Sequence, residues 1–180
     1  MKRKIFISIN IPKKDKKRLI RAVEPWQDLP VKWVKEPNFH ITLAFLGHVY
    51  DNALPAIGQA VERAVSGKMM FDVQFSEIKL NSEEDPKIVW LAGSASEELK
   101  NLQEAIEKEL GLFASAKKVF IPHVTLGRIR KQKWEEQETK PKIKKALDFL
   151  VTVESVDVMA SDFENEGEEY AIIDSFQLNG

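Results

Sequence analysis

Apolar and polar positions alternate with a period of two along most of this 180-residue chain, and helical spacing replaces the alternation in three places. Alternation of this kind predicts β-strands with one apolar face. The predicted strands cover residues 4–9, 31–35, 39–46, 70–80, 87–92, 119–130, 151–159 and 170–178. Apolar residues that recur every three to four positions predict helices over residues 12–24, 52–65 and 97–110.

The predicted helix ends carry residues that suit them. Pro12 opens the first helix and Pro25 stops it, while Ser96 can cap the third helix and Gly111 follows its last turn. Three segments show neither period, and we expect a loop over 134–141, a helical turn over 142–147 and an acidic turn at 165–167.

Strands that come in pairs around long helices predict an α+β fold with antiparallel sheets. No segment is low in complexity, and none has the composition of an interdomain linker. A chain of 180 residues can bury one substantial core, or two small lobes that share one. We therefore expect residues 1–180 to form a single domain.

A short motif occurs twice: His40-Ile41-Thr42-Leu43 recurs as His123-Val124-Thr125-Leu126. The copies lie 83 positions apart, close to half the chain length, and they hold two of its three histidines. On a strand, the histidine and threonine of each copy project from the same face. One His-x-Thr on a strand is most often structural, but two copies in a histidine-poor chain favour a shared site.

The residue types in this motif suit phosphate chemistry. Two imidazoles can act as a proton donor and a proton acceptor near neutral pH. Hydroxyls and imidazolium N–H groups donate hydrogen bonds to the oxygens of a tetrahedral anion. We therefore expect His40, Thr42, His123 and Thr125 to surround a phosphodiester, with hydrolysis that needs no metal and no cofactor.

Composition narrows the alternatives. The chain has no cysteine, which excludes disulfides, thiolate chemistry and Cys-ligated zinc. No acidic residue stands beside either motif histidine at metal-ligand spacing. No apolar run approaches the roughly 20 residues that a membrane-spanning helix needs, and the run after the basic N-terminus is too short for a signal peptide.

A net charge of −1 does not by itself indicate a nucleic-acid-binding protein. The charges are unevenly placed, however, since residues 2–18 and 128–145 are rich in Lys and Arg while acidic residues gather over 157–169. Basic runs are most often solvated faces. The alternative is a local basic approach to an RNA backbone.

The motifs and their flanks resemble the 2H phosphoesterases, and most closely the RNA 2′,3′-cyclic phosphodiesterases, also called 2′–5′ RNA ligases. The resemblance rests on the two motifs with their approaches, 31–47 and 120–128, and on the opening strand 3–9 that leads to Pro12. It extends to the segment 170–178. It implies two pseudo-symmetric lobes of antiparallel sheet backed by helices, with the motif strands lining a central cleft.

The resemblance also implies an activity, the opening of 2′,3′-cyclic phosphate ends of RNA to 2′-phosphomonoesters, with reversible 2′–5′ ligation as an additional reaction. His40 is then the proton donor, His123 the proton acceptor, and Thr42, Thr125 and Arg128 bind the substrate. The implied protein is a cytoplasmic monomer that acts on RNA ends, such as those of tRNA fragments, and has no membrane partner. The alternatives are a phosphodiesterase of small cyclic nucleotides and a non-catalytic module that binds RNA ends.

Four further residues near the motifs have two interpretations each. Strict alternation puts Arg128 on the face opposite His123, so a role at the phosphate requires a bulge or a strand end near Gly127. Phe45 occupies the matching place after His40, and we expect it to pack in the core. We expect Trp33 to be a buried anchor rather than a base-stacking residue, and His48 to be a surface residue.

Overall fold

The two motif strands lie side by side at the centre of one antiparallel sheet in the computed structural model, which describes residues 1–113, 119–161 and 169–180. β3 (His40–Tyr50) and β6 (His123–Ile129) are the adjacent strands. The sheet order is β7-β4-β5-β6-β3-β1-β8-β9, and the short β2 (Val31–Trp33) pairs with the outer end of β6. The predicted α+β fold with antiparallel pairing is confirmed.

The remaining elements have the following bounds. The strands are β1 (Lys2–Asn10), β4 (Phe71–Leu80), β5 (Ile88–Gly93), β7 (Lys144–Val153), β8 (Ser155–Ala160) and β9 (Ala171–Gln177). The helices are α1 (Lys13–Val23), α2 (Leu54–Val65), α3 (Glu97–Leu110) and α4 (Lys131–Glu135). Single 3-10 turns occur at Glu24–Trp26, Glu36–Asn38, Asp51–Ala53 and Gly111–Phe113.

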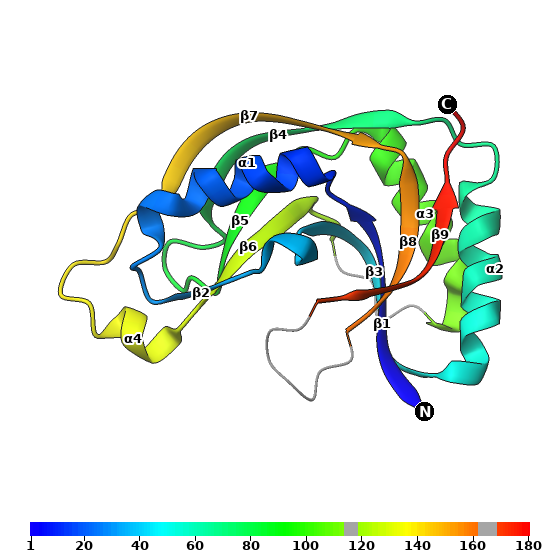
Figure 1. The fold of residues 1–180 in the computed structure, drawn as a ribbon, viewed down its shortest axis with the longest axis horizontal. Coiled ribbons are helices and arrows are strands. Elements are labelled where there is room, and N and C mark those ends of the chain that lie inside the picture. The colour runs from blue at the N-terminus through cyan, green and yellow to red at the C-terminus, as the bar shows by residue number, and fades with distance from the viewer. Residues whose placement is uncertain (114–118, 162–168) are drawn as a thin grey trace.

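The sheet consists of two four-stranded halves that meet between β3 and β6. We call β3, β1, β8 and β9 the first half, and β6, β5, β4 and β7 the second half. Helices α2 and α3 lie against the first half, while α1 lies across β4, β5 and β7 of the second (Figure 1). On that side the Arg18 guanidinium stacks 4.8 Å from the centre of the Phe149 ring. The helix that follows β1 therefore covers the opposite half of the sheet.

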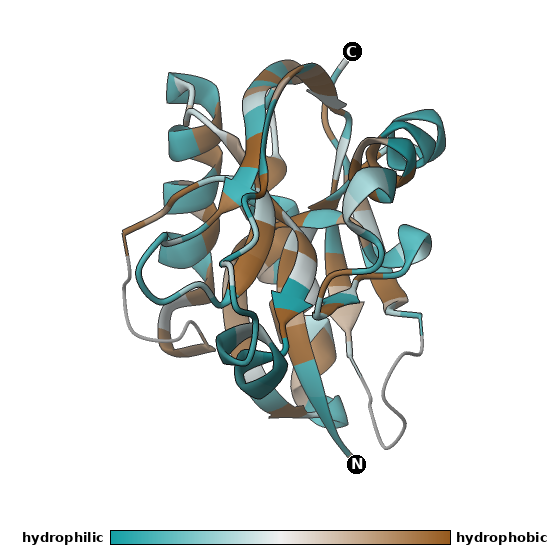
Figure 2. Cartoon of the chain, turned by 90° about the vertical axis from the view of Figure 1, so that its left-hand side faces the viewer, coloured by the Kyte–Doolittle hydropathy of each residue, from teal (hydrophilic) through white to brown (hydrophobic). Residues whose placement is uncertain are grey.

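The core lies between each half of the sheet and the helices that cover it. Along β1, Ile5, Ile7 and Ile9 are buried and alternate with residues of the other face. Figure 2 shows the hydrophobic colour concentrated on the central strands, while the outer surfaces of the helices are largely hydrophilic. Burial of each such aliphatic side chain contributes about 1.5–3 kcal/mol.

The helix signals in the sequence are confirmed for α3. The Ser96 hydroxyl accepts a hydrogen bond from the Leu99 N–H at 3.2 Å, as expected of an N-cap. Gly111 follows the last turn with φ +51°, a conformation that costs glycine little.

The predictions for the segment after β6 were wrong in three places. Residues 131–135 form α4, where Trp134 is buried, so the loop expected over 134–141 begins only at residue 136. Residues 144–153 form β7 rather than a helical turn, because pairing with β4 overrides the weak strand propensity of the lysines. The strand predicted over 151–159 is two strands, since the chain leaves the second half at Glu154 and joins the first. The turn predicted at 165–167 lies outside the described residues.

Gly127 allows β2 to approach β6 closely. Trp33 is the cross-strand partner of Gly127, and a Cβ at this glycine would lie 2.4 Å from Val31 Cγ1 and 3.0 Å from Trp33 Cε3. Trp33 is half-buried against the core, as expected for an anchor.

Substitution of Gly127 should therefore displace β2. We expect Gly127→Ala to lower the free energy of unfolding by about 1–3 kcal/mol, the usual cost of overpacking, measured by urea denaturation. Gly58→Ala, on α2, is the matched control. Alanine favours a helix, and the atom nearest to a Cβ at position 58 belongs to the flexible Asp174 carboxylate, at 3.3 Å. Equal stability of Gly127→Ala and the parent chain would contradict this account of the β2–β6 contact.

Candidate active site

One residue pair between β3 and β6 brings the two motifs together. Ile41 lies opposite Val124 in antiparallel register, and both side chains are fully buried. Their neighbours on each strand point to the other face of the sheet. The four predicted residues therefore share one partly exposed face at the junction of the halves, with His40 opposite Thr125 and Thr42 opposite His123.

Both imidazoles are held in the same orientation by the backbone. His40 Nδ1 lies 2.7 Å from the carbonyl oxygen of Asn38, and His123 Nδ1 lies 2.7 Å from that of Ile121. A carbonyl oxygen only accepts, so each Nδ1 carries the proton and donates it. In the neutral ring Nε2 is then the basic nitrogen. Thr42 Oγ1 lies 2.9 Å from His40 Nε2, within hydrogen-bond distance.

Aromatic rings that the sequence reasoning missed pack against each imidazole. Phe6 lies 4.9 Å and Tyr170 lies 5.5 Å from His40 between ring centres, with Tyr170 edge-on. Trp90, on β5, lies 4.8 Å from His123. Tyr170 is also tied to the approach of the first motif, because its N–H donates to Asn38 Oδ1 at 2.8 Å. The strand alternation around Phe6 and Trp90 was the available signal; nothing local in the sequence marks Tyr170.

Lys16 is a second group that the sequence reasoning missed. The sequence places it in a basic run with the composition of a solvated face, yet its Nζ donates to the Pro37 carbonyl at 2.7 Å, three residues before His40. Burial lowers the pKa of Lys16, and nearby carboxylates, chiefly that of Glu36, oppose the effect. Its charge reaches His40, whose pKa it lowers.

Each motif strand contains an extra residue at the same place, and β3 contains a second one at Leu46. On β3 the partners of β1 pass from Thr42 to Ala44, which leaves out Leu43, and on β6 the partners of β5 pass from Thr125 to Gly127, which leaves out Leu126. A bulge of this kind reverses the alternation that follows it. The residue five positions after each histidine is thereby turned to the histidine side of the sheet.

Arg128 and Phe45 occupy these two matching positions. Arg128 is exposed, and its charge lowers the pKa of His40, which agrees with a place on the histidine side. The bulge that a phosphate role for Arg128 requires is therefore present beside Gly127. Phe45 is 56% exposed, so the expectation that it packs in the core was wrong. His48 is exposed, as expected.

Burial is the main influence on the charge of the two histidines. It lowers the pKa of His40 to about 4, while the bond to Asn38 works against it and the charges of His123, Lys16 and Arg128 add to it. Burial also lowers the pKa of His123, against the Ile121 carbonyl. Both rings are therefore neutral at pH 7, and an anion between them would raise both pKa values.

Metal clusters and membrane-spanning helices are both absent from residues 1–113, 119–161 and 169–180. No group of three or more His, Asp or Glu side chains lies close enough to hold a metal ion. No helix in the same ranges is both long and apolar enough to cross a membrane.

This arrangement has the parts that acid–base cleavage of a phosphodiester requires. Two imidazoles present Nε2 across a junction that also holds two hydroxyls and a guanidinium. These are the parts that a two-histidine phosphoesterase would use. The sequence profile of the 2′-5′ RNA ligase superfamily matches residues 15–164, and the chain belongs to this superfamily.

Named relatives agree with this assignment. The chain is 28% identical to the RNA 2′,3′-cyclic phosphodiesterase of Thermotoga maritima, over 97% of this chain and 95% of that protein. It is 26% identical to the RNA 2′,3′-cyclic phosphodiesterase of Bacillus subtilis, over 97% and 96% of the two chains.

Solved structures share the fold. TT0787 of Thermus thermophilus superposes with a TM-score of 0.79 at 22% identity over 98% of each chain. LigT of E. coli, in a complex with 3′-AMP, superposes with a TM-score of 0.81 at 20% identity over all of both chains.

The lowered pKa of His40 should appear in the pH dependence of stability. Unfolded histidine has a pKa near 6.5. Between about pH 6.5 and pH 4 the unfolded chain therefore binds more protons than the folded chain, and the free energy of unfolding decreases as the pH is lowered. His40→Gln does not titrate, so the stability that this variant loses between pH 7 and pH 4.5 should be smaller than the loss of the parent chain by about 2.5 kcal/mol.

Urea denaturation at the two pH values provides the measurement. His48→Gln removes an exposed histidine of the same strand and should keep the pH dependence of the parent chain. If His40→Gln shows that same dependence, His40 is not held neutral by burial.

Proposed function

We propose that this protein hydrolyses 2′,3′-cyclic phosphate ends of RNA to 2′-phosphomonoesters through His40 and His123. The observation that carries the proposal is the shared orientation of the two imidazoles, each fixed at Nδ1 by a backbone carbonyl two residues earlier. The names of the relatives from Thermotoga maritima and Bacillus subtilis support this choice of substrate.

In the proposed reaction His123 Nε2 takes a proton from water, whose oxygen attacks the phosphorus. The bond from phosphorus to the 3′-oxygen breaks, and the 3′-oxygen receives a proton from His40 Nε2. The 2′-ester remains, so the product is a 2′-phosphomonoester with a free 3′-hydroxyl. A proton returns from His123 to His40 through solvent before the next turnover.

The other predicted residues bind the phosphate in this proposal. Thr42 and Thr125 donate from their hydroxyls to the non-bridging oxygens, and the Arg128 guanidinium neutralises the charge that grows there. Thr42 is within hydrogen-bond distance of His40 Nε2, so it must exchange this partner for a phosphate oxygen when the substrate binds.

The assignment of His40 as the donor comes from the family resemblance, since the two motifs are nearly symmetric. The electrostatics add a condition to it. With a pKa of about 4, His40 is neutral at pH 7 and must gain its proton in the substrate complex. A bound phosphodiester supplies the cause, because it neutralises Arg128, which otherwise lowers this pKa, and adds a negative charge of its own.

Phe45 is suited to the nucleobase of the same nucleotide. It lies on the histidine side of β3, with an exposed ring 6.3 Å from that of Phe6, which itself packs against His40. An exposed aromatic ring beside a phosphate site offers a base a stacking surface. The two residues that the bulges turn to the histidine side would then contact different parts of the nucleotide: Arg128 the phosphate and Phe45 the base.

Ligation follows from the same arrangement if a 5′-hydroxyl of RNA replaces water. His123 takes its proton, the new oxygen bonds to phosphorus, and the 3′-oxygen leaves with the proton of His40. The product is a 2′–5′ linkage. Its cleavage is the reverse reaction, with the two histidines exchanging roles.

The central test uses an oligoribonucleotide with a 2′,3′-cyclic phosphate end and adenosine 2′,3′-cyclic phosphate, both in EDTA. We expect hydrolysis of the oligomer to its 2′-phosphate. Replacement of either His40 or His123 by alanine should lower the rate at least about 10²-fold, because each performs one proton transfer. The double variant should be little worse than the weaker single variant, since the two act as a unit.

Each other result of this test has a definite meaning. Hydrolysis of the mononucleotide alone would indicate an enzyme for small cyclic nucleotides. Binding of the oligomer with no turnover would indicate an RNA-end-binding module. Loss of activity in EDTA with rescue by one divalent ion would replace the two-histidine mechanism by a metal centre.

Arg128 should matter more than its neighbour Arg130. Arg128→Ala removes a charge-assisted contact and should lower kcat/KM clearly, while Arg128→Lys keeps the charge but loses the planar fork and should fall between. Arg130, which lies after the end of β6, is the matched control and should cost much less. A larger effect from Arg130→Ala would remove Arg128 from the phosphate site.

A further inference from the structure

Beyond the motif, β3 continues toward the edge of the molecule with a row of exposed side chains on the histidine side. In its pairing with β1, Phe45 lies opposite Phe6, His48 opposite Lys4, and Tyr50 opposite Lys2. Partners directly opposite each other project from the same face. We call the exposed members of this row the β1–β3 strip: Lys2, Lys4, Phe45, His48 and Tyr50.

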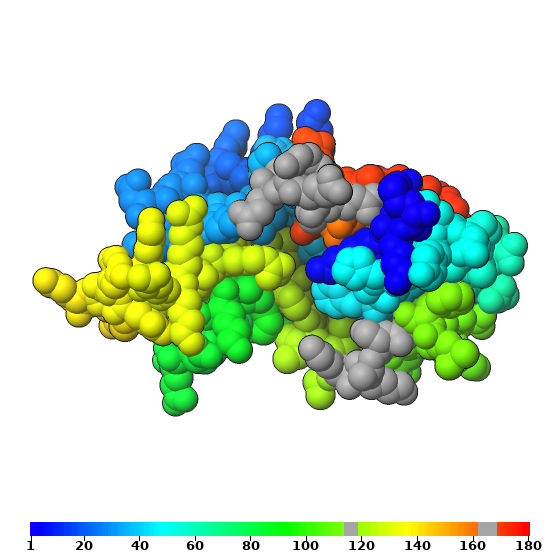
Figure 3. Space-filling model, turned by 90° about the horizontal axis from the view of Figure 1, so that it is seen from below, coloured from blue at the N-terminus to red at the C-terminus, as the bar shows by residue number. Residues whose placement is uncertain are grey.

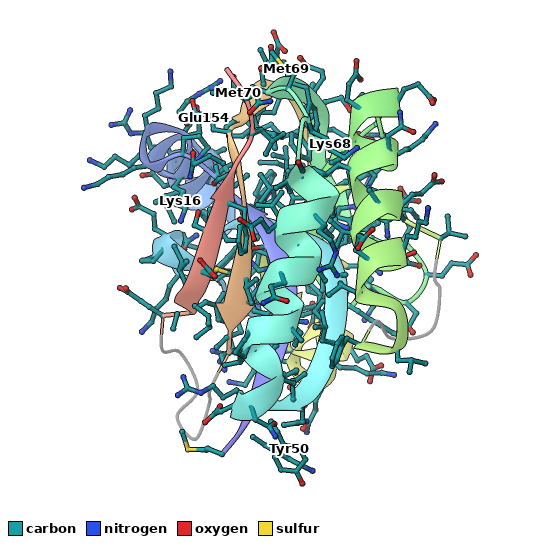
Figure 4. All side chains as sticks on the ribbon, turned by 90° about the vertical axis from the view of Figure 1, so that its right-hand side faces the viewer. Lys16, Tyr50, Lys68, Met69, Met70 and Glu154 are labelled. Carbon is teal, nitrogen blue, oxygen red and sulfur yellow. The ribbon has the colours of Figure 1, made fainter. Side chains whose placement is uncertain are left out.

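The strip combines two aromatic rings with two lysine ammonium groups. Phe45 and Tyr50 are 56% and 59% exposed, and between them lies the row of Lys4 and His48. Lys2 Nζ stands 4.6 Å from the centre of the Tyr50 ring. Figure 4 shows Tyr50 at the lower end of the fold, below the end of α2. Proteins that bind single-stranded nucleic acid stack its bases on aromatic rings and contact its phosphate backbone with cationic side chains.

Among the described residues, the Asp51 carboxylate at this end is engaged outside the strip. Asp51 follows Tyr50, and its carboxylate pairs with the Met1 amino group at 3.3 Å and with Arg3 Nε at 3.0 Å. Arg3 belongs to the other face of β1, opposite the buried Val49. Both partners of Asp51 therefore lie outside the strip, while Lys2 contacts the Tyr50 ring within it.

The corresponding face of the second half has its cations close to carboxylates. On the neighbouring strand β4, the residue opposite Trp90 is Lys79, whose ammonium group forms an ion pair with Glu77 at 2.5 Å. Beyond it lies a pocket of about 770 Å³ whose lining combines the acidic turn Glu83–Asp85 with several lysines. In Figure 3, the blue start of β1 and the cyan end of β3 lie together on the side of the molecule opposite this turn and α4.

We propose that the β1–β3 strip holds the RNA nucleotides that precede the cyclic phosphate, so that the strand runs from the histidines past Phe45 toward Tyr50. This inference rests on the proposed function and adds the path of the strand and a preference for oligomers. From Phe6 to Lys2 the strand advances about 13 Å at about 3.3 Å per residue. A nucleotide strand advances about 3.4 Å per residue when fully stacked and more when extended. The strip therefore accommodates about two to four nucleotides.

The experiment measures kcat/KM for adenosine 2′,3′-cyclic phosphate and for oligoadenylates of increasing length with the same end. We expect kcat/KM to rise with length and to level off by about four nucleotides. Tyr50→Ala should lower the ratio of the oligomer value to the mononucleotide value about tenfold, and Tyr50→Phe should restore it, because stacking needs the ring and not the hydroxyl. Phe45→Ala should lower both values, since each substrate has a terminal base.

The cationic part of the strip is tested by salt. For single strands, each phosphate contact contributes about 0.7 to the slope of log affinity against log salt. Lys2→Gln/Lys4→Gln should therefore reduce the slope measured for the oligomer by up to about 1.4. Lys100→Gln/Lys108→Gln removes the same charge from the exposed side of α3 and should leave the slope unchanged.

The possible failures are distinct. If the mononucleotide and the oligomers are hydrolysed equally well, or if Tyr50→Ala leaves their ratio unchanged, the strip proposal is wrong while the proposed function stands. If no substrate is hydrolysed, the proposed function fails, and binding of a 2′-phosphorylated oligomer then decides the strip: weaker binding by Tyr50→Ala and by Lys2→Gln/Lys4→Gln supports it, and unchanged binding overturns it.

Discussion

The pairing of Ile41 with Val124 is the contact on which the geometry of the site depends. These two buried residues are the only cross-strand partners that β3 and β6 share among the described residues, and they fix the register in which the two motifs face one another. A shift of one residue in that register would turn one motif toward the core. The central position of this pair makes such a shift expensive, because strands already pack on both outer sides of β3 and β6.

Around that contact, the backbone and the flanking rings give the histidines a fixed orientation before any ligand arrives. The carbonyls of Asn38 and Ile121 fix the tautomer, and Phe6, Tyr170 and Trp90 limit rotation of the rings. The same rings remove water from the imidazoles, which favours the neutral form. Preorganisation and a depressed pKa thus have a common origin in the packing of these side chains.

The positions of the motifs could be predicted from the sequence because alternation and repetition are local properties. The period of two around His40 and His123 predicts strands with the histidines on one face, and it is correct up to the leucine of each motif. The bulges at Leu43 and Leu126 have no comparable signal, since an apolar residue there fits either a regular strand or a bulge. Strict alternation therefore assigned Phe45 to the core.

Contacts made across long sequence separations were the other limit. Tyr170 reaches His40 because β9 is added to the first half by residues far along the chain, and β7 forms because β4 offers an edge. The family resemblance predicted antiparallel sheet backed by helices correctly, but neither it nor the local pattern placed Lys16 beside Pro37.

The way in which the elements cross between the halves has a consequence for how the chain reaches its native state. The first half needs β8 and β9, which are made after every strand of the second half, and the second half needs α1, which is made before all of them. Neither half can close its core from a contiguous stretch of the sequence. Contacts of this separation slow folding, and during synthesis the surroundings of His40 stay incomplete until Tyr170 has been made. The site that the two motifs form is therefore complete only when the last strands of the chain are in place.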